Sequence, residues 1–204
     1  MKSLRNNSPI IILCTNSLDK VREYRQIFAT CDMDVTLLIP SDFGYYGEPN
    51  EIAVTYEGNA MIKADAFFRD QYITIADDSG LEVLALNKAP GVDSANYAYI
   101  GAHDAHNCEK LLKELGKKTD RSAKFIAVIA CILPNGERFT VRGECEGEIL
   151  TEANGANGFG YDSLFFYRPM GKSFAEMTAE EKNSVSHRVR AVKLLIEQLK
   201  SKGY

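Results

Sequence analysis

The chain has 204 residues, of which 45% are hydrophobic and 25% are charged, as in ordinary globular proteins. Its net charge of −4 argues against a general nucleic-acid binder, because such proteins carry a basic excess or stripe. Five scattered cysteines without a CxxC pair, and no apolar stretch of membrane-spanning or signal-peptide type, predict a cytoplasmic protein without disulfides, zinc or a membrane partner.

The first part of the chain alternates predicted strands and helices. Residues 10–14 (IIILC) are short, apolar and β-branched, which is typical of a buried strand. A helix is predicted over 17–29, because its apolar residues recur on one face. The elements expected next are a strand over 35–39, a loop over 41–51, a helix over 56–68 and a strand over 72–76.

The second part favours long strands. Residues 121–149 predict two of them, joined by the turn Pro134-Asn135-Gly136-Glu137. A helix is expected over 103–115, and Thr178 and Glu181 have capping-box spacing. The amphipathic segment 184–200 predicts a last helix whose apolar face comprises Val185, Val189, Val192, Ile196 and Leu199. We therefore expect one domain over 1–204, of α/β class, with two lobes sharing one sheet.

Residues 75–80 (IADDSG) place two carboxylates, Asp77 and Asp78, where the third strand is expected to end. One interpretation is an Asx turn, in which Gly80 permits the turn. The other is a magnesium site at the end of the strand, since Mg²⁺ takes one or two carboxylates plus substrate phosphates. Side chains alternate along a strand, so one aspartate would face the crevice and the other support it.

Residues 15–20 (TNSLDK) stand between the first strand and the first helix. Helix N-termini attract anions, and Lys20 adds a positive charge one turn in, so this segment is a candidate phosphate site. Ordinary N-capping by Thr15, Asn16 or Ser17 is the alternative.

Two further segments carry candidate ligand contacts. In 155–166 (GANGFGYDSLFF), glycines flank Phe159 and Tyr161, which favours either a base-stacking loop or a glycine-rich turn into an aromatic core strand. In 180–191 (EEKNSVSHRVRA), basic residues gather in an acidic protein, and a solvated helix face is the alternative. A nucleoside triphosphate needs an acid pair for metal, an anion site, an aromatic platform and a basic cluster, and these segments supply all four.

Together with TYEGNAMIKA (55–64) and APGVDSANYA (89–98), these segments resemble the inosine triphosphate pyrophosphatases, the noncanonical purine NTP pyrophosphatases that clean the nucleotide pool. The resemblance covers nearly the whole chain. It implies a two-lobed α/β fold with a long central mixed sheet flanked by helices and an active site in the cleft between the lobes. It also implies a homodimer that uses Mg²⁺ to hydrolyse ITP, dITP or XTP to the monophosphate and pyrophosphate.

The resemblance also implies residue roles. Asp78 is expected to bind the metal and act as catalytic base, with Ser79 beside the substrate and Glu51 or Glu48 as the second metal ligand. Arg188 is our first choice as the reader of the 6-oxo group of the base. The residues expected to bind substrate are Thr15, Asn16, Ser17, Leu18, Asp19, Lys20, Ser79, Phe159, Gly160, Tyr161, Asp162, Lys182, His187 and Arg188.

The sequence departs from the family pattern at Ser17, where the family has Asn, and at Asn96, where it has Arg. Asp77 is left as either a supporting metal contact or a structural turn acceptor. Three alternatives to the main hypothesis stay open: a pyrophosphatase for dUTP or modified pyrimidines, a non-catalytic nucleotide-binding module, and a general phosphatase that releases orthophosphate.

Overall fold

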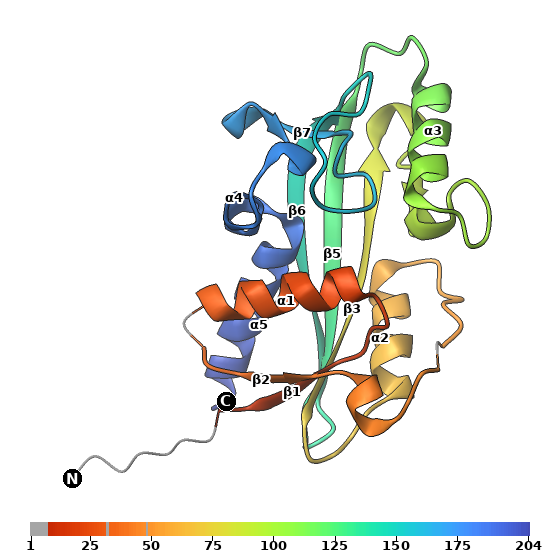
Figure 1. Ribbon diagram of the computed structural model, residues 1–204. Helices are drawn as coiled ribbons and strands as arrows, with labels where there is room; N and C mark the ends of the chain where they lie inside the picture. Colours follow the sequence, from red (N-terminus) through yellow and green to blue (C-terminus); the bar gives the residue numbers. More distant parts are fainter. Residues whose placement is uncertain (1–7, 32, 48) are drawn as a thin grey trace.

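The computed structural model describes residues 8–31, 33–47 and 49–204. Within these residues, eight strands form one mixed sheet in the order β2-β1-β3-β5-β6-β7-β8, with β4 paired to β3 (Figure 1). β1 is parallel to β2 and β3, and every other pairing is antiparallel. The strands are β1 Ile10–Leu13, β2 Thr36–Leu38, β3 Ile73–Val83, β4 Pro90–Gly91, β5 Ser122–Ile132, β6 Arg138–Ile149, β7 Phe165–Tyr167 and β8 Lys172–Ser173.

Serine or threonine side chains cap the N-termini of most of the described helices. Ser17, Thr55, Thr178 and Ser186 each accept a hydrogen bond from a backbone N–H in the first turn of the helix that follows. The helices are α1 Leu18–Thr30, α2 Tyr56–Ala66, α3 Asp104–Leu115, α4 Ala179–Val185 and α5 His187–Ser201. The capping box expected at Thr178 and Glu181 is confirmed.

The long strands β3, β5 and β6 run through two lobes (Figure 1). In the first lobe, α1 and α5 cover one face of the sheet and α2 covers the other. Strand alternation explains this: Ile11 and Leu13 pack with α1 and α5, whereas Ile12 and Cys14 pack with α2. In the second lobe, α3 packs with the far ends of the long strands and with Phe165 and Phe174. The expected two-lobed mixed sheet is confirmed.

The prediction that the third strand ends at Ala76 is wrong, because β3 continues to Val83. Asp77 and Asp78 therefore lie within the strand, opposite Ile129 and Val128 of β5, and not in an Asx turn. Gly80 does not permit a turn. A Cβ there would lie 2.3 Å from the carbonyl oxygen of Gly91, so this glycine admits the close pairing with β4.

The predicted C-terminal helix is interrupted at Ser186, which ends α4 and caps α5. Val185 consequently packs in the second lobe, while Val189 and Val192 pack in the first, so the single apolar face expected over 184–200 is wrong at its first residue. The hairpin of β5 and β6 is as expected. In the part of the chain that the structure describes, no helix has the length and apolar character needed to cross a membrane.

Candidate active site

A cavity of about 820 Å³ lies between the lobes, a size typical of small-molecule sites. The start of α1, the middle of β3, one face of α2 and the loop that carries Glu51 supply one side. The loop before α3, the loop over 159–162 and the adjoining ends of α4 and α5 supply the rest. The cavity thus unites all four segments that the sequence singled out.

The α1 end of the cavity is lined by Thr15, Asn16, Ser17 and Lys20. Ser17 Oγ accepts a hydrogen bond from Lys20 N at 3.3 Å, so Ser17 both caps α1 and lines the cavity. Leu18 and Asp19 are not among the described residues that line the cavity: Leu18 is 71% exposed, and Asp19 pairs with Arg22. At this end these two residues can offer a ligand the backbone N–H groups of a helix start.

The Asp78 side chain points to the α2 side of the sheet. Lys63 Nζ on α2 lies 2.9 Å from Asp78 Oδ1 and 2.8 Å from Glu51 Oε2. Burial raises the pKa of Asp78 to about 6, although Lys63 opposes the shift. Asp78 Oδ2 is buried without a hydrogen-bond partner among the described residues.

Asp78 and Glu51 fit a divalent cation. Their carboxylates already converge on one positive charge, and Asp78 keeps an oxygen without a partner. Two carboxylates leave the other positions to water and phosphate oxygens, as Mg²⁺ prefers. The described residues contain no cluster of three or more potential ligands of the His, Cys, Asp and Glu types, so a larger protein cage is not formed there. Glu48, the alternative ligand, lies outside the described residues.

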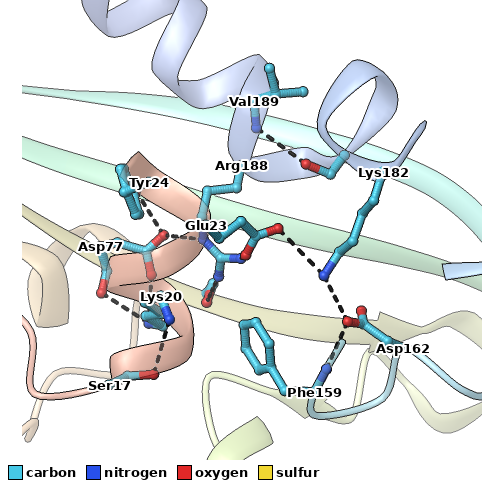
Figure 2. A network of polar contacts seen from close by, with 12 residues as sticks. Ser17, Lys20, Glu23, Tyr24, Asp77, Phe159, Asp162, Lys182, Arg188 and Val189 are labelled. Carbon is cyan, nitrogen blue, oxygen red and sulfur yellow. Dashed lines mark hydrogen bonds and ion pairs between the residues drawn. The ribbon is translucent and has the colours of Figure 1, made fainter. Parts of the chain in front are cut away.

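Asp77 points to the opposite face, toward α1 and α5. Its Oδ1 lies 2.5 Å from Lys20 Nζ, and its Oδ2 accepts hydrogen bonds from Tyr24 Oη at 3.0 Å and Arg188 Nε at 3.1 Å (Figure 2). Burial alone would raise the pKa of Asp77, but the adjacent Lys20 and Arg188 outweigh it and hold that pKa well below its usual range.

The opposite end of the cavity, called here the Phe159 end, is formed by Phe159, Gly160, Tyr161, Asp162 and Lys182. Asp162 Oδ2 accepts hydrogen bonds from Phe159 N at 3.0 Å and Lys182 Nζ at 2.7 Å. Lys182 Nζ also lies 5.0 Å from the centre of the Phe159 ring (Figure 2). A cation and an aromatic ring are therefore fixed side by side.

The two aromatic residues of this loop differ in role. Tyr161 is 4% exposed and donates its hydroxyl to the carbonyl of Ser94 at 2.8 Å, so it is an aromatic core residue that also borders the cavity. Phe159 is only half-buried and presents its ring. Gly158 has φ +76°, and a Cβ there would lie 2.1 Å from Asp162 Oδ2, which explains the glycine before Phe159.

His187 and Arg188 begin α5 at the cavity wall. His187 stacks on Phe125, with ring centres 4.7 Å apart, and burial together with Arg188 and Lys182 holds its pKa well below the usual value. The Arg188 guanidinium contacts Asp77 and Glu23, and its Nη2 donates to Ser79 Oγ at 3.0 Å. Much of its donor capacity is thus used within the protein, while it still borders the cavity.

Sequence reasoning missed two charged residues. Lys63 lies on α2 next to the buried Ala64 and one turn after the buried Ala60, and a lone lysine at such a position was the available signal. Glu23 is 7% exposed and contacts Arg188 and Lys182. Its spacing from Lys20, one helical turn, was the available signal. Asn96, a departure from the family pattern, lines the cavity and accepts a hydrogen bond from Gly101 N at 2.8 Å.

The fold and the cavity define a class: two-lobed α/β proteins whose interlobe cavity joins a helix start and buried lysines to an acid pair and an aromatic loop. The particular family follows from comparison with known proteins. The model of the Ham1 family matches residues 11–198, and the chain belongs to that family. The resemblance drawn from the sequence is thereby confirmed.

Similar proteins cover nearly the whole chain. A protein of Desulfotalea psychrophila named dITP/XTP pyrophosphatase is 47% identical over 185 residues, 90% of this chain and 82% of the relative. A Bacillus cereus protein of the same name is 40% identical over 198 residues, 95% of this chain and 96% of the relative. The solved structure of the Staphylococcus aureus Ham1 protein has a TM-score of 0.83 and 37% identity, covering 95% of this chain and 99% of that one.

Proposed function

We propose that this protein hydrolyses noncanonical purine nucleoside triphosphates, namely ITP, dITP and XTP, to the nucleoside monophosphate and pyrophosphate, and so cleans the nucleotide pool. The observation that carries the proposal is the cavity itself. It places a helix start with Lys20 at one end, the Phe159 ring with Lys182 at the other, and Asp78 between the elements that form them. The names of the relatives from Desulfotalea psychrophila and Bacillus cereus agree with it.

The proposed cofactor is Mg²⁺, held by Asp78 and Glu51. When bound, it neutralises the charge that develops on the phosphate oxygens. Asp78 orients a water and takes its proton as the water oxygen attacks the α-phosphorus. The bond from that phosphorus to the bridging oxygen breaks, and pyrophosphate leaves. Lys20 and the first N–H groups of α1 hold the phosphate tail.

Base selection is proposed to occur at the Phe159 end. Phe159 stacks on the base, while Lys182, His187 and Arg188 surround it, and donors there meet the 6-oxo group of hypoxanthine or xanthine. Adenine carries an amino group at that position, so those donors would be left unpaired. An unpaired buried polar group costs about 1–3 kcal/mol, which is enough for selection.

We further propose that the protein is cytoplasmic and forms a homodimer. The dimer is supported by large apolar side chains left in solvent outside the cavity lining, among them Ile52 and Val54, which are 82% and 88% exposed. Light scattering after gel filtration tests this: a mass twice that of the chain is expected, and a monomer would contradict it.

Product analysis tests the proposed activity. The purified protein is incubated with ITP, dITP, XTP, GTP, ATP and dUTP, with Mg²⁺ or with a chelator, and pyrophosphate and orthophosphate are measured separately. Pyrophosphate from ITP, dITP and XTP, lost with the chelator, is the expected result. Orthophosphate would indicate a general phosphatase, preference for dUTP a pyrimidine enzyme, and binding without turnover a nucleotide-binding module.

A further inference from the structure

Asp77 lies behind the cavity wall and not in it. Its side chain is fully buried, and it is not among the described residues that line the cavity, whereas Lys20, Ser79 and Arg188 are. The carboxylate therefore does not touch a bound substrate. Any effect of Asp77 on the reaction passes through the residues that it holds.

The residues held by Asp77 belong to opposite ends of the cavity. Oδ1 pairs with Lys20 at the α1 end, and Oδ2 accepts from Arg188 Nε. From Arg188 the contacts continue through Glu23 to Lys182 and Asp162 at the Phe159 end (Figure 2). Arg188 Cζ itself lies 5.7 Å from the centre of the Phe159 ring. Positive and negative groups alternate along this path, so each charge is compensated by its neighbours.

Tyr24 fixes the orientation of the carboxylate. Its hydroxyl donates to Asp77 Oδ2, the oxygen that also accepts from Arg188. Tyr24 is fully buried on α1, one turn after Lys20. Lys20 and Tyr24, both on α1, thus contact different oxygens of the carboxylate, Lys20 as an ion pair and Tyr24 as a hydrogen-bond donor.

We propose that Asp77, oriented by Tyr24, is a positioning residue that couples the two ends of the cavity by holding the side chains of Lys20 and Arg188 at a fixed position relative to each other. Asp77 sets the distance between the group that binds the phosphate tail and the group beside the base. This proposal rests on the proposed function, which places the phosphate tail at the α1 end and the base at the Phe159 end. It assigns to the two neighbouring aspartates separate tasks on opposite faces of β3.

Binding measurements test the coupling without requiring turnover. Calorimetry gives the Kd for pyrophosphate, a probe of the α1 end, and for inosine, a probe of the Phe159 end, both with Mg²⁺ present. Asp77→Asn keeps the shape and removes the charge, and we expect both Kd values to rise roughly 10-fold or more, because it breaks two buried charge pairs. Lys20→Met is expected to raise the Kd for pyrophosphate alone, and Arg188→Met is expected to raise the Kd for inosine alone.

Tyr24→Phe is the milder variant and decides the matter where Asp77→Asn does not fold. Loss of one hydrogen bond to a carboxylate should raise both Kd values by about 2- to 5-fold. Tyr56→Phe and Thr74→Val are matched controls, since each removes a buried hydroxyl without a hydrogen-bond partner among the described residues, and both are expected to bind as the wild type does.

The outcomes separate cleanly. A change at both ends in Asp77→Asn or Tyr24→Phe, absent from the controls, supports the coupling. Unchanged Kd values in a folded variant with a lowered Tm would mean that Asp77 has only a structural role. A change at one end only would mean that Asp77 does not link the two ends. Either result overturns the proposal. Failure of the proposed function would appear elsewhere, as a wild-type protein that binds these probes but releases no pyrophosphate from ITP.

Discussion

Lys63 and Asp78 form an ion pair of 2.9 Å that joins the middle of α2 to the middle of β3. The side chains of Lys63 and Asp78 are 12% and 9% exposed, so water does little to screen the pair. The same ammonium reaches Glu51, and it keeps apart two carboxylates that would otherwise repel each other. In this structure the lysine therefore takes the place that a cation would have between them.

Replacing this lysine should make the protein depend on added metal for stability. Lys63→Met leaves Asp78 and Glu51 uncompensated, so we expect its Tm in chelator to fall, and the rise in Tm on adding Mg²⁺ to be larger than in the wild type. Thermal unfolding with and without Mg²⁺ measures both. Lys124→Met, which breaks a more exposed ion pair with Glu144, is the control and should show no such enlargement. Equal Mg²⁺ effects in Lys63→Met and the wild type would exclude these carboxylates as the metal site.

Asp78→Asn should remove turnover while the protein stays folded. The amide cannot accept the proton of the attacking water, and loss of a general base costs about 100- to 10,000-fold in rate. Pyrophosphate release from ITP and thermal unfolding measure the two effects. Asp65→Asn, an exposed aspartate paired with Arg138, is the matched control and should keep full activity. Near-normal turnover in Asp78→Asn would assign the base elsewhere.

Gly143→Ala should push the start of α5 away from β6, the strand that carries Gly143. A Cβ at Gly143 would lie 2.2 Å from the carbonyl oxygen of His187 and 2.4 Å from Ala191 N, so the helix must move. We expect a loss of about 1–3 kcal/mol in the free energy of unfolding and a lower kcat/KM for ITP. Denaturant unfolding and steady-state kinetics measure these. Thr140→Ala, at an exposed position on the same strand, should change neither, and an unaltered Gly143→Ala would show that α5 is free to shift.

His187 should make stability fall as the pH drops. Its folded-state pKa is depressed by burial and by Arg188 and Lys182, whereas the unfolded chain takes up the proton near pH 6.5. The stabilisation is thus complete above about pH 6.5 and declines below it, by at most about 1.4 kcal/mol per pH unit.

A comparison of variants isolates this effect from other groups. The raised pKa of Asp78 acts with the opposite sign between pH 4 and 6, but it is present in the wild type and in His187→Gln alike. The difference in unfolding free energy between these two proteins should shrink from pH 7.5 to pH 5. His106→Gln, at an exposed histidine, should follow the wild type. A constant difference for His187→Gln would mean that the pKa of His187 is not depressed in the folded protein.

The sequence allowed the order of elements to be predicted because apolar periodicity is a local property. Strand β1, helix α1 and the hairpin of β5 and β6 follow the expected ranges closely. The end of β3 was missed for a physical reason. Two aspartates inside a buried strand are tolerated only because Lys20, Arg188 and Lys63 reach them from three different helices. The residues that compensate these negative charges are far apart in the chain, so no local sequence pattern predicts the pairing.

The same limit applies to the site. The segments that line the cavity were found from their composition, and the family resemblance united them. The task of Asp77 could not be found, because it depends on which face of β3 each aspartate occupies and on the helix that covers that face. Glu23 was missed for the same reason: it acts on Arg188, which is 165 positions away.

The three long strands have a mechanical consequence. β3, β5 and β6 are paired without interruption along their shared length, and both lobes are built on them. A hinge between the lobes would have to bend this ladder at its hydrogen-bonded centre, at the level of Asp78 itself. Any adjustment of the cavity around a ligand would therefore fall to its loops, such as those that carry Glu51 and Ile100, while the continuous sheet keeps the groups that it carries at constant spacing.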